Sequence, residues 1–187
     1  MITWFHISDI HLNRSGVETR RLRKQLLSFL KKKQIRSKYI FFTGDLRYAP
    51  DGDFDSDTVP FLDSLAETLG VEKRNVFIVP GNHDIERDNS DRSDALRVIC
   101  NNDSDYYNPK VGTIGDSELE KIYTSEKDFA LLMDKFYDGL PDRACLYHDW
   151  SKPHFTVVSD DFNIIHVNST LTYSADHEND LIIGTEK

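Results

Sequence analysis

Three short β-forming runs, each followed at once by a polar cluster, constrain the fold of this chain most strongly. The runs and their clusters are residues 2–7 with Asp9-Ile10-His11, residues 39–43 with Gly44-Asp45, and residues 75–79 with Gly81-Asn82-His83-Asp84. In a parallel α/β sheet, ligand sites lie outside the carboxyl ends of the strands. The sequence therefore predicts a parallel sheet that gathers these carboxylate, imidazole and amide groups along one edge.

Helical patterns separate the three runs. The apolar residues at helical spacing are Leu22, Leu26, Leu27 and Leu30 in the first interval, and Phe61, Leu62, Leu65 and Leu69 in the second. Pro60 falls in the first turn of the second helix, and Gly70 is placed to end it. The order strand–helix–strand–helix–strand predicts two right-handed crossovers, and hence an α/β fold with helices flanking a parallel sheet.

Residues 85–150 break this rhythm and are interpreted as a helical insertion, with helices expected at 94–99 and 118–137. An insertion of this length after a site-forming loop is often a lid or cap over the site. A helical embellishment that packs on the outside is the alternative, and the sequence leaves both open. Residues 154–158 and 162–167 then predict a β-hairpin.

The size and composition are those of one ordinary globular domain, which we expect to span residues 1–187. Hydrophobic residues make up 39% of the chain, and no apolar run is long enough to cross a membrane. The two cysteines are too few for a disulfide framework, so a reducing cytoplasm is the expected location.

Charge is distributed unevenly along the chain, whose net charge is -9. Residues 14–38 hold ten of the 23 Lys and Arg residues, with Glu18 as their only acid, whereas residues 39–187 hold 30 acids against 13 bases. Binding to nucleic acid requires many clustered cations, so it is possible but not favoured. The basic block is interpreted first as a solvated helix face and second as a phosphate-steering patch.

The clusters offer the ligands of a site for two divalent metal ions such as Mn, Fe or Zn. Asp9 and His11, two residues apart, are expected to hold one ion together, Asp45 to bridge two ions, and Asn82 to add a neutral oxygen to the second. Paired ions acidify a shared water and supply hydroxide to attack phosphorus. His83 is the expected general acid for the leaving group, and Asp84 is expected to raise the basicity of His83 or to orient it.

These motifs closely resemble those of the calcineurin-like metallophosphoesterase superfamily. Its Asp-x-His, Gly-Asp and Gly-Asn-His-Asp/Glu signatures have counterparts in Ser8-Asp9-Ile10-His11-Leu12, Thr43-Gly44-Asp45-Leu46 and Pro80-Gly81-Asn82-His83-Asp84. The resemblance implies an α/β/β/α sandwich with two ions bound in a single site. It also implies that Asp9, His11, Asp45 and Asn82 are metal ligands and that His83 is the catalytic residue.

The last histidine motifs of the family pattern are missing from this chain. Family members continue to a further histidine and a Gly-His-x-His loop, which complete the metal site and the second half of the sandwich, and nothing here matches them. We therefore expect an incomplete second half, completed by a missing C-terminal region or by a homodimer partner. The histidines outside the clusters are interpreted as strand residues (His6, His166) or as weak ligand candidates (His148, His154, His177).

The leading functional hypothesis is a metal-dependent phosphohydrolase acting on a phosphodiester or phosphomonoester. DNA exonucleases of the same superfamily provide one alternative. A non-catalytic regulatory or interaction module that keeps half of the fold is the other, favoured by the absent distal histidines and opposed by the presence of His83.

Overall fold

Parallel pairing joins the three predicted strands in the computed structural model of the protein. They are β1 (Trp4–Ile7), β2 (Tyr39–Thr43) and β3 (Val76–Val79), in the order β1-β2-β3. Because the three strands are parallel, their carboxyl ends lie at one edge of the sheet, as the sequence predicts.

The structure describes residues 2–12, 17–48, 54, 56–86, 90–100, 107–108, 113–114, 116–143, 146–147, 152, 154–159 and 161–173.

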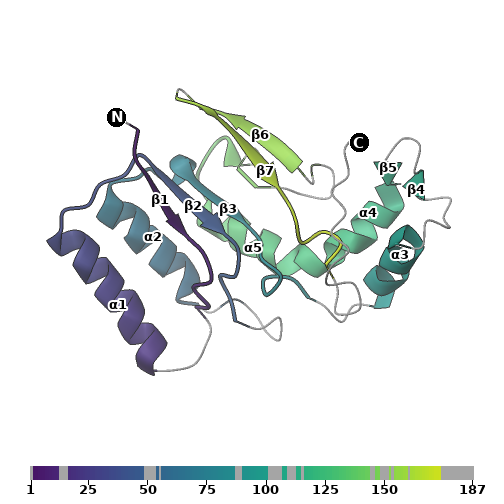
Figure 1. Ribbon diagram of the computed structural model, residues 1–187, viewed down its shortest axis with the longest axis horizontal. Helices are drawn as coiled ribbons and strands as arrows, with labels where there is room; N and C mark the ends of the chain where they lie inside the picture. Colours follow the sequence, from purple (N-terminus) through teal and green to yellow (C-terminus); the bar gives the residue numbers. More distant parts are fainter. Residues whose placement is uncertain are drawn as a thin grey trace.

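Helices and a hairpin cover opposite faces of this sheet. Helices α1 (Val17–Lys32) and α2 (Thr58–Leu69) lie on one side, and the hairpin of β6 (His154–Val158) and β7 (Asn163–Val167) lies on the other (Figure 1). The ring of Tyr39 on β2 lies 4.9 Å from that of Phe162, beside the hairpin. The next residue, Ile40, faces the helices because side chains alternate along a strand. The α/β fold class and the hairpin are confirmed.

The second helix follows its prediction closely, while the first differs in which residues it buries. Gly70 ends α2 in the left-handed conformation, with φ of 72°. In α1, Leu22 is 65% exposed, and the neighbouring Arg23 is buried instead, where its guanidinium donates to the carbonyl of Leu12 at 2.9 Å. The helix predicted from the leucine spacing is confirmed, and its more buried face runs through Arg23, Leu26, Leu27 and Leu30.

The segment between β3 and the hairpin is mostly helical. Its elements are α3 (Ser90–Cys100), β4 (Tyr107–Asn108), β5 (Thr113–Ile114), α4 (Asp116–Tyr123), η2 (Thr124–Glu126) and α5 (Lys127–Phe136). The helix expected at 118–137 is thus two helices separated by a 3₁₀ turn. Glu126 in that turn is buried and accepts hydrogen bonds from the Asn168 amide at 2.7 and 3.0 Å, so the turn carries a tertiary contact that a continuous pattern does not reveal.

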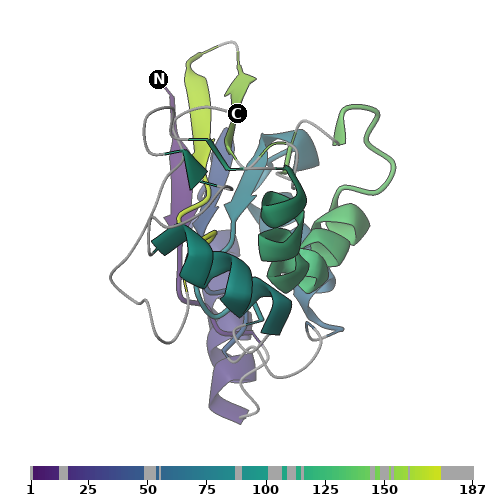
Figure 2. The same cartoon turned by 90° about the vertical axis from the view of Figure 1, so that its right-hand side faces the viewer.

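Two apolar cores divide this segment. The side chains of α5 join the main core beneath the sheet, whereas Ala95 and Leu96 of α3 pack with Leu119 and Ile122 of α4 in a smaller cluster. Figure 1 shows α3 and α4 at the opposite end of the molecule from α1, and in Figure 2 this end faces the viewer, with α1 behind it. We predicted that residues 85–150 form one insertion that could act as a cap, and both points stay predictions. Within the described residues, no helix is both long and apolar enough to span a membrane.

Candidate metal centre

The structure brings together Asp9, His11 and Asp45 at the carboxyl ends of β1 and β2. One potential ligand atom from each residue lies within 4.8 Å of the others. Two carboxylate oxygens and one imidazole nitrogen form a donor set that suits Mn, Fe or Zn. The chemistry of this cluster therefore fits the metal site that the sequence predicts.

Backbone conformation distinguishes these same three residues. Asp9, His11 and Asp45 have φ of 56°, 49° and 57°, and the only other non-glycine residue with positive φ in the described part of the chain is Gln34. Residues with side chains seldom adopt this left-handed region, and such strain gathers at functional sites where the surrounding structure enforces it. The coincidence of strain and ligand chemistry supports a functional role for the cluster.

Main-chain hydrogen bonds between the two loops enforce these conformations. The amide of Asp9 donates to the carbonyl of Gly44 at 3.1 Å, and the amide of His11 donates to the carbonyl of Asp45 at 3.1 Å. A third bond, from Leu12 to Leu46 at 2.6 Å, continues the pairing. The loops that follow β1 and β2 are thus joined by backbone hydrogen bonds beyond the ends of their strands. These bonds hold the candidate ligand residues close together.

The imidazole of His11 is oriented by the backbone. Its Nδ1 lies 3.0 Å from the carbonyl oxygen of Arg47. Because a carbonyl oxygen only accepts hydrogen bonds, Nδ1 carries the proton and Nε2 keeps the lone pair. A ligating histidine is commonly fixed in this way, with the second nitrogen donating to a carbonyl or carboxylate.

Two glycines allow the β2 and β3 loops to approach each other. A Cβ added to Gly44 would lie 2.7 Å from the Cα of Gly81, and one added to Gly81 would overlap the carboxylate of Asp45. That carboxylate also accepts a hydrogen bond from the amide of His83, with Asp45 Oδ1 3.1 Å from the nitrogen. The Gly-Asp and Gly-Asn-His-Asp clusters are therefore in direct contact.

Asp84 joins the loops rather than the imidazole of His83. Its buried carboxylate accepts hydrogen bonds from the backbone amides of Leu46 (3.2 Å), Arg47 (2.9 Å) and Gly81 (2.9 Å). Burial raises the pKa of Asp84 to about 6. The three hydrogen bonds lower this pKa, but their effect is smaller than that of burial. The predicted contact that would orient His83 is replaced by main-chain contacts, because this carboxyl group lies beneath the loops.

Arg47 is a residue of the site that the sequence analysis missed. Its fully buried guanidinium donates to the carbonyls of His83 and Asp84, at 2.9 and 3.0 Å, and lies 3.5 Å from a carboxylate oxygen of Asp128 on α5. It also lies over the ring of Phe54, 4.7 Å from the centroid. An arginine two residues after a Gly-Asp pair carries no sequence signal for this role, since its partners are carbonyls from distant segments.

The imidazole of His83 lies beside the three ligand candidates. Its ring centroid is 5.4 Å from that of His11, with the two planes nearly perpendicular, and Tyr48 completes a group of three rings. Asn82 is half-buried in the same turn as His83, at the end of β3.

Comparison with known proteins decides the family. A family model described as calcineurin-like phosphoesterase matches residues 2–183. The chain belongs to the calcineurin-like phosphoesterase family. It is also 26% identical over 175 residues to an uncharacterized metallophosphoesterase-like protein, YydB, of Bacillus subtilis (strain 168). That match covers 91% of this chain and 34% of the relative, so the chain spans about a third of the length of the curated relative it matches.

The remaining described histidines of this calcineurin-like phosphoesterase have other partners. His6 Nε2 lies 2.7 Å from the hydroxyl of Thr43, and His154 Nδ1 accepts a hydrogen bond from the amide of Asn168 at 3.1 Å. His166 is buried, with its ring stacked on that of Phe155. His148 and His177 lie outside the described residues.

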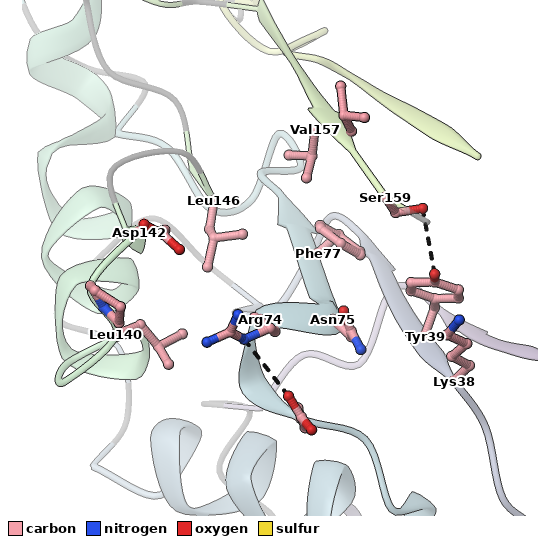
Figure 3. A pocket seen from close by; sticks show the side chains of 13 residues that line it. Lys38, Tyr39, Arg74, Asn75, Phe77, Leu140, Asp142, Leu146, Val157 and Ser159 are labelled. Carbon is pink, nitrogen blue, oxygen red and sulfur yellow. Dashed lines mark hydrogen bonds and ion pairs between the residues drawn. The ribbon is translucent and has the colours of Figure 1, made fainter. Parts of the chain in front are cut away.

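A separate hollow of about 450 Å³ lies at the opposite end of the sheet of this calcineurin-like phosphoesterase (Figure 3). Lys38 and Asn75, which line it, precede β2 and β3, so it opens at the amino ends of the strands. Its walls are apolar at Leu146 and Val157, and Arg74 lies at its rim with an ion pair to Glu72. The candidate metal cluster, at the carboxyl ends of the strands, is therefore remote from this hollow.

Proposed function

We propose that this chain is a divalent-metal-dependent phosphohydrolase that acts on a phosphodiester or phosphomonoester. The observation that carries the proposal is the Asp9, His11 and Asp45 cluster, whose ligand atoms lie within 4.8 Å of one another on strained backbone. Membership of the calcineurin-like phosphoesterase family supports the same reaction class. The proposed metals are two ions of Mn, Fe or Zn, with Asn82 as a further ligand.

Each group has a distinct task in this proposal. Asp9 and His11 would hold one ion, Asp45 would be the ligand shared with a second ion, and Asn82 would add a neutral oxygen to that second ion. Divalent ions bound in this way stabilise charge on phosphoryl oxygens and acidify water near neutral pH. The backbone contact of His11 Nδ1 with the Arg47 carbonyl leaves Nε2 as the coordinating atom.

His83 is the proposed general acid, which donates a proton to the departing alkoxide. Its main chain is held on both sides, since its amide donates to Asp45 and its carbonyl accepts from Arg47. Asp84 acts at a distance from the reaction by binding the β2 and β3 loops together. These contacts support a fixed position for the imidazole beside the metal ligands.

Hydrolysis of p-nitrophenyl phosphate and bis(p-nitrophenyl) phosphate in Mn²⁺ tests the proposal. We expect Asp45→Asn to lower kcat/KM at least 100-fold, because it weakens the ligand shared by both ions. Glu72→Gln is the matched control, since this exposed acid lies at the opposite end of the sheet. Full activity of Asp45→Asn would refute the proposal. If an oligonucleotide inhibits this hydrolysis, and inhibits it less at high salt, the result would favour nucleic acid as the substrate.

A further inference from the structure

Tyr48 forms an ordered group of rings with the two histidines of the centre. Its ring plane is within 9° of that of His83, with centroids 6.0 Å apart. The ring of His11 stands edge-on to both, at 5.4 Å from Tyr48 and 5.4 Å from His83. Offset-parallel and edge-to-face pairs at these separations are the favoured aromatic geometries.

Packing of the core does not account for the position of Tyr48. Its side chain is 44% exposed, and it belongs to neither of the two apolar clusters in the described part of the chain. The ring of Tyr48 contacts both histidines of the site. Its sequence position gave no hint of this arrangement.

The backbone that carries Tyr48 is fixed by the same residue that holds both histidines. Arg47, its neighbour, accepts from His11 Nδ1 through its carbonyl and donates to the carbonyl of His83 through its guanidinium. The three rings are therefore connected through Arg47. Within this group, the His83 imidazole contacts the rings of both His11 and Tyr48.

We propose that Tyr48 is a positioning residue, which holds the imidazole of His83 in the orientation that protonates the leaving group. This inference rests on the proposed phosphohydrolase function. Without the phenol ring, the imidazole loses one of its two ring contacts, and a smaller fraction of molecules has the acid correctly aimed. Misplacement of a catalytic group by about 1 Å can cost on the order of 100-fold in rate.

Leaving-group dependence separates this role from a general weakening of the site. A p-nitrophenolate departs readily without a proton, whereas an alkoxide needs one from the general acid. For Tyr48→Leu, we expect kcat to fall at least 10-fold more for a methyl phosphodiester that loses methoxide than for its p-nitrophenyl counterpart, with little change in KM. Tyr48→Phe keeps the ring and should retain near wild-type values for both substrates.

Two readouts do not depend on activity. The ring protons of His83, assigned with His83→Gln, should change chemical shift in Tyr48→Leu because the neighbouring aromatic ring is gone, and should change little in Tyr48→Phe. Mn²⁺ affinity should stay within threefold of wild type, since Tyr48 is not a proposed ligand. Phe29→Leu, which removes an exposed aromatic ring from α1, is the matched control.

The outcomes distinguish this inference from the function on which it rests. Equal losses for both leaving groups, or unchanged His83 resonances in Tyr48→Leu, would overturn the positioning role while leaving the phosphohydrolase proposal intact. Absence of hydrolysis by the wild-type chain with Mn²⁺ bound would overturn both. A larger loss for the methoxide substrate together with shifted His83 resonances supports the inference.

Discussion

At Gly81, the Asp45 carboxylate occupies the space that a side chain would need. Gly81→Ala should therefore displace this proposed ligand, and we expect Mn²⁺ affinity to fall about 10- to 100-fold, the usual cost of disturbing groups that support a metal ligand. Isothermal titration calorimetry of the wild type and the variant measures the change.

Gly139→Ala is the control for this substitution. Gly139 has φ of 82°, but among the described residues no atom lies within 4 Å of an added Cβ. The variant should lose about 1 kcal/mol of stability through backbone strain, with unchanged metal affinity. Equal metal affinities for the two alanine variants would contradict the role given to Gly81.

Asp84 gives the metal-free protein a pH-dependent stability. Burial raises the pKa of its carboxyl from 3.8 to about 6, so the folded state binds a proton more tightly than the unfolded state. The stabilising contribution is complete below pH 3.8 and is lost as the pH rises through about 6, a change of about 3 kcal/mol.

Urea denaturation in EDTA between pH 4 and 7 checks this prediction. Asp84→Asn removes the titrating group. The unfolding free energy of the wild type minus that of the variant should therefore decrease as the pH rises from 4 to 7. A difference that is constant with pH, or that shifts in the other direction, would show that the carboxyl is not protonated in the folded state.

At the scale of elements, α5 connects the main core to both ends of β3. The hydroxyl of Tyr137, directly after α5, donates to the carbonyl of Val76 at 2.7 Å, and both groups are buried. Near the opposite end of β3, Asp128 on α5 meets the guanidinium of Arg47. The helix therefore supports the metal centre without contributing a proposed ligand.

Tyr137→Phe tests this packing. The Val76 carbonyl would lose its partner hydroxyl in a buried place, and we expect a destabilisation of about 1–2 kcal/mol in denaturant unfolding. Tyr147→Phe is the comparison, since the Tyr147 hydroxyl donates to Asp134, a half-exposed carboxylate that water can solvate. A loss in Tyr147→Phe equal to or larger than that in Tyr137→Phe would argue against this account of α5.

Sequence patterns predicted the elements whose local signals agree with their burial. The three β-forming runs, the Gly70 helix end and the 154–167 hairpin are of this kind. The break between α4 and α5 was missed because it depends on the contact of Glu126 with Asn168, which is distant in sequence. The burial of Arg23 in α1 was likewise not predictable, because it depends on a hydrogen bond from its guanidinium to the carbonyl of Leu12.

At the scale of the whole molecule, the sheet topology explains why the candidate site was predictable. Parallel strands bring Asp9, His11 and Asp45 to one edge wherever the intervening helices lie. The supporting residues were not predictable, since Arg47 and Tyr48 act through carbonyls and rings that are placed only by the folded loops. The positive φ angles of the ligands likewise arise from pairing between loops.

Anomalous diffraction from crystals of the chain soaked in Mn²⁺ tests the central claim most directly. The account predicts an anomalous peak within coordinating distance of the carboxylates of Asp9 and Asp45 and of His11 Nε2, and its loss in Asp45→Asn. Peaks found only elsewhere on the molecule, or a peak at this cluster that keeps its full height in Asp45→Asn, would contradict the assignment of these residues as the metal centre.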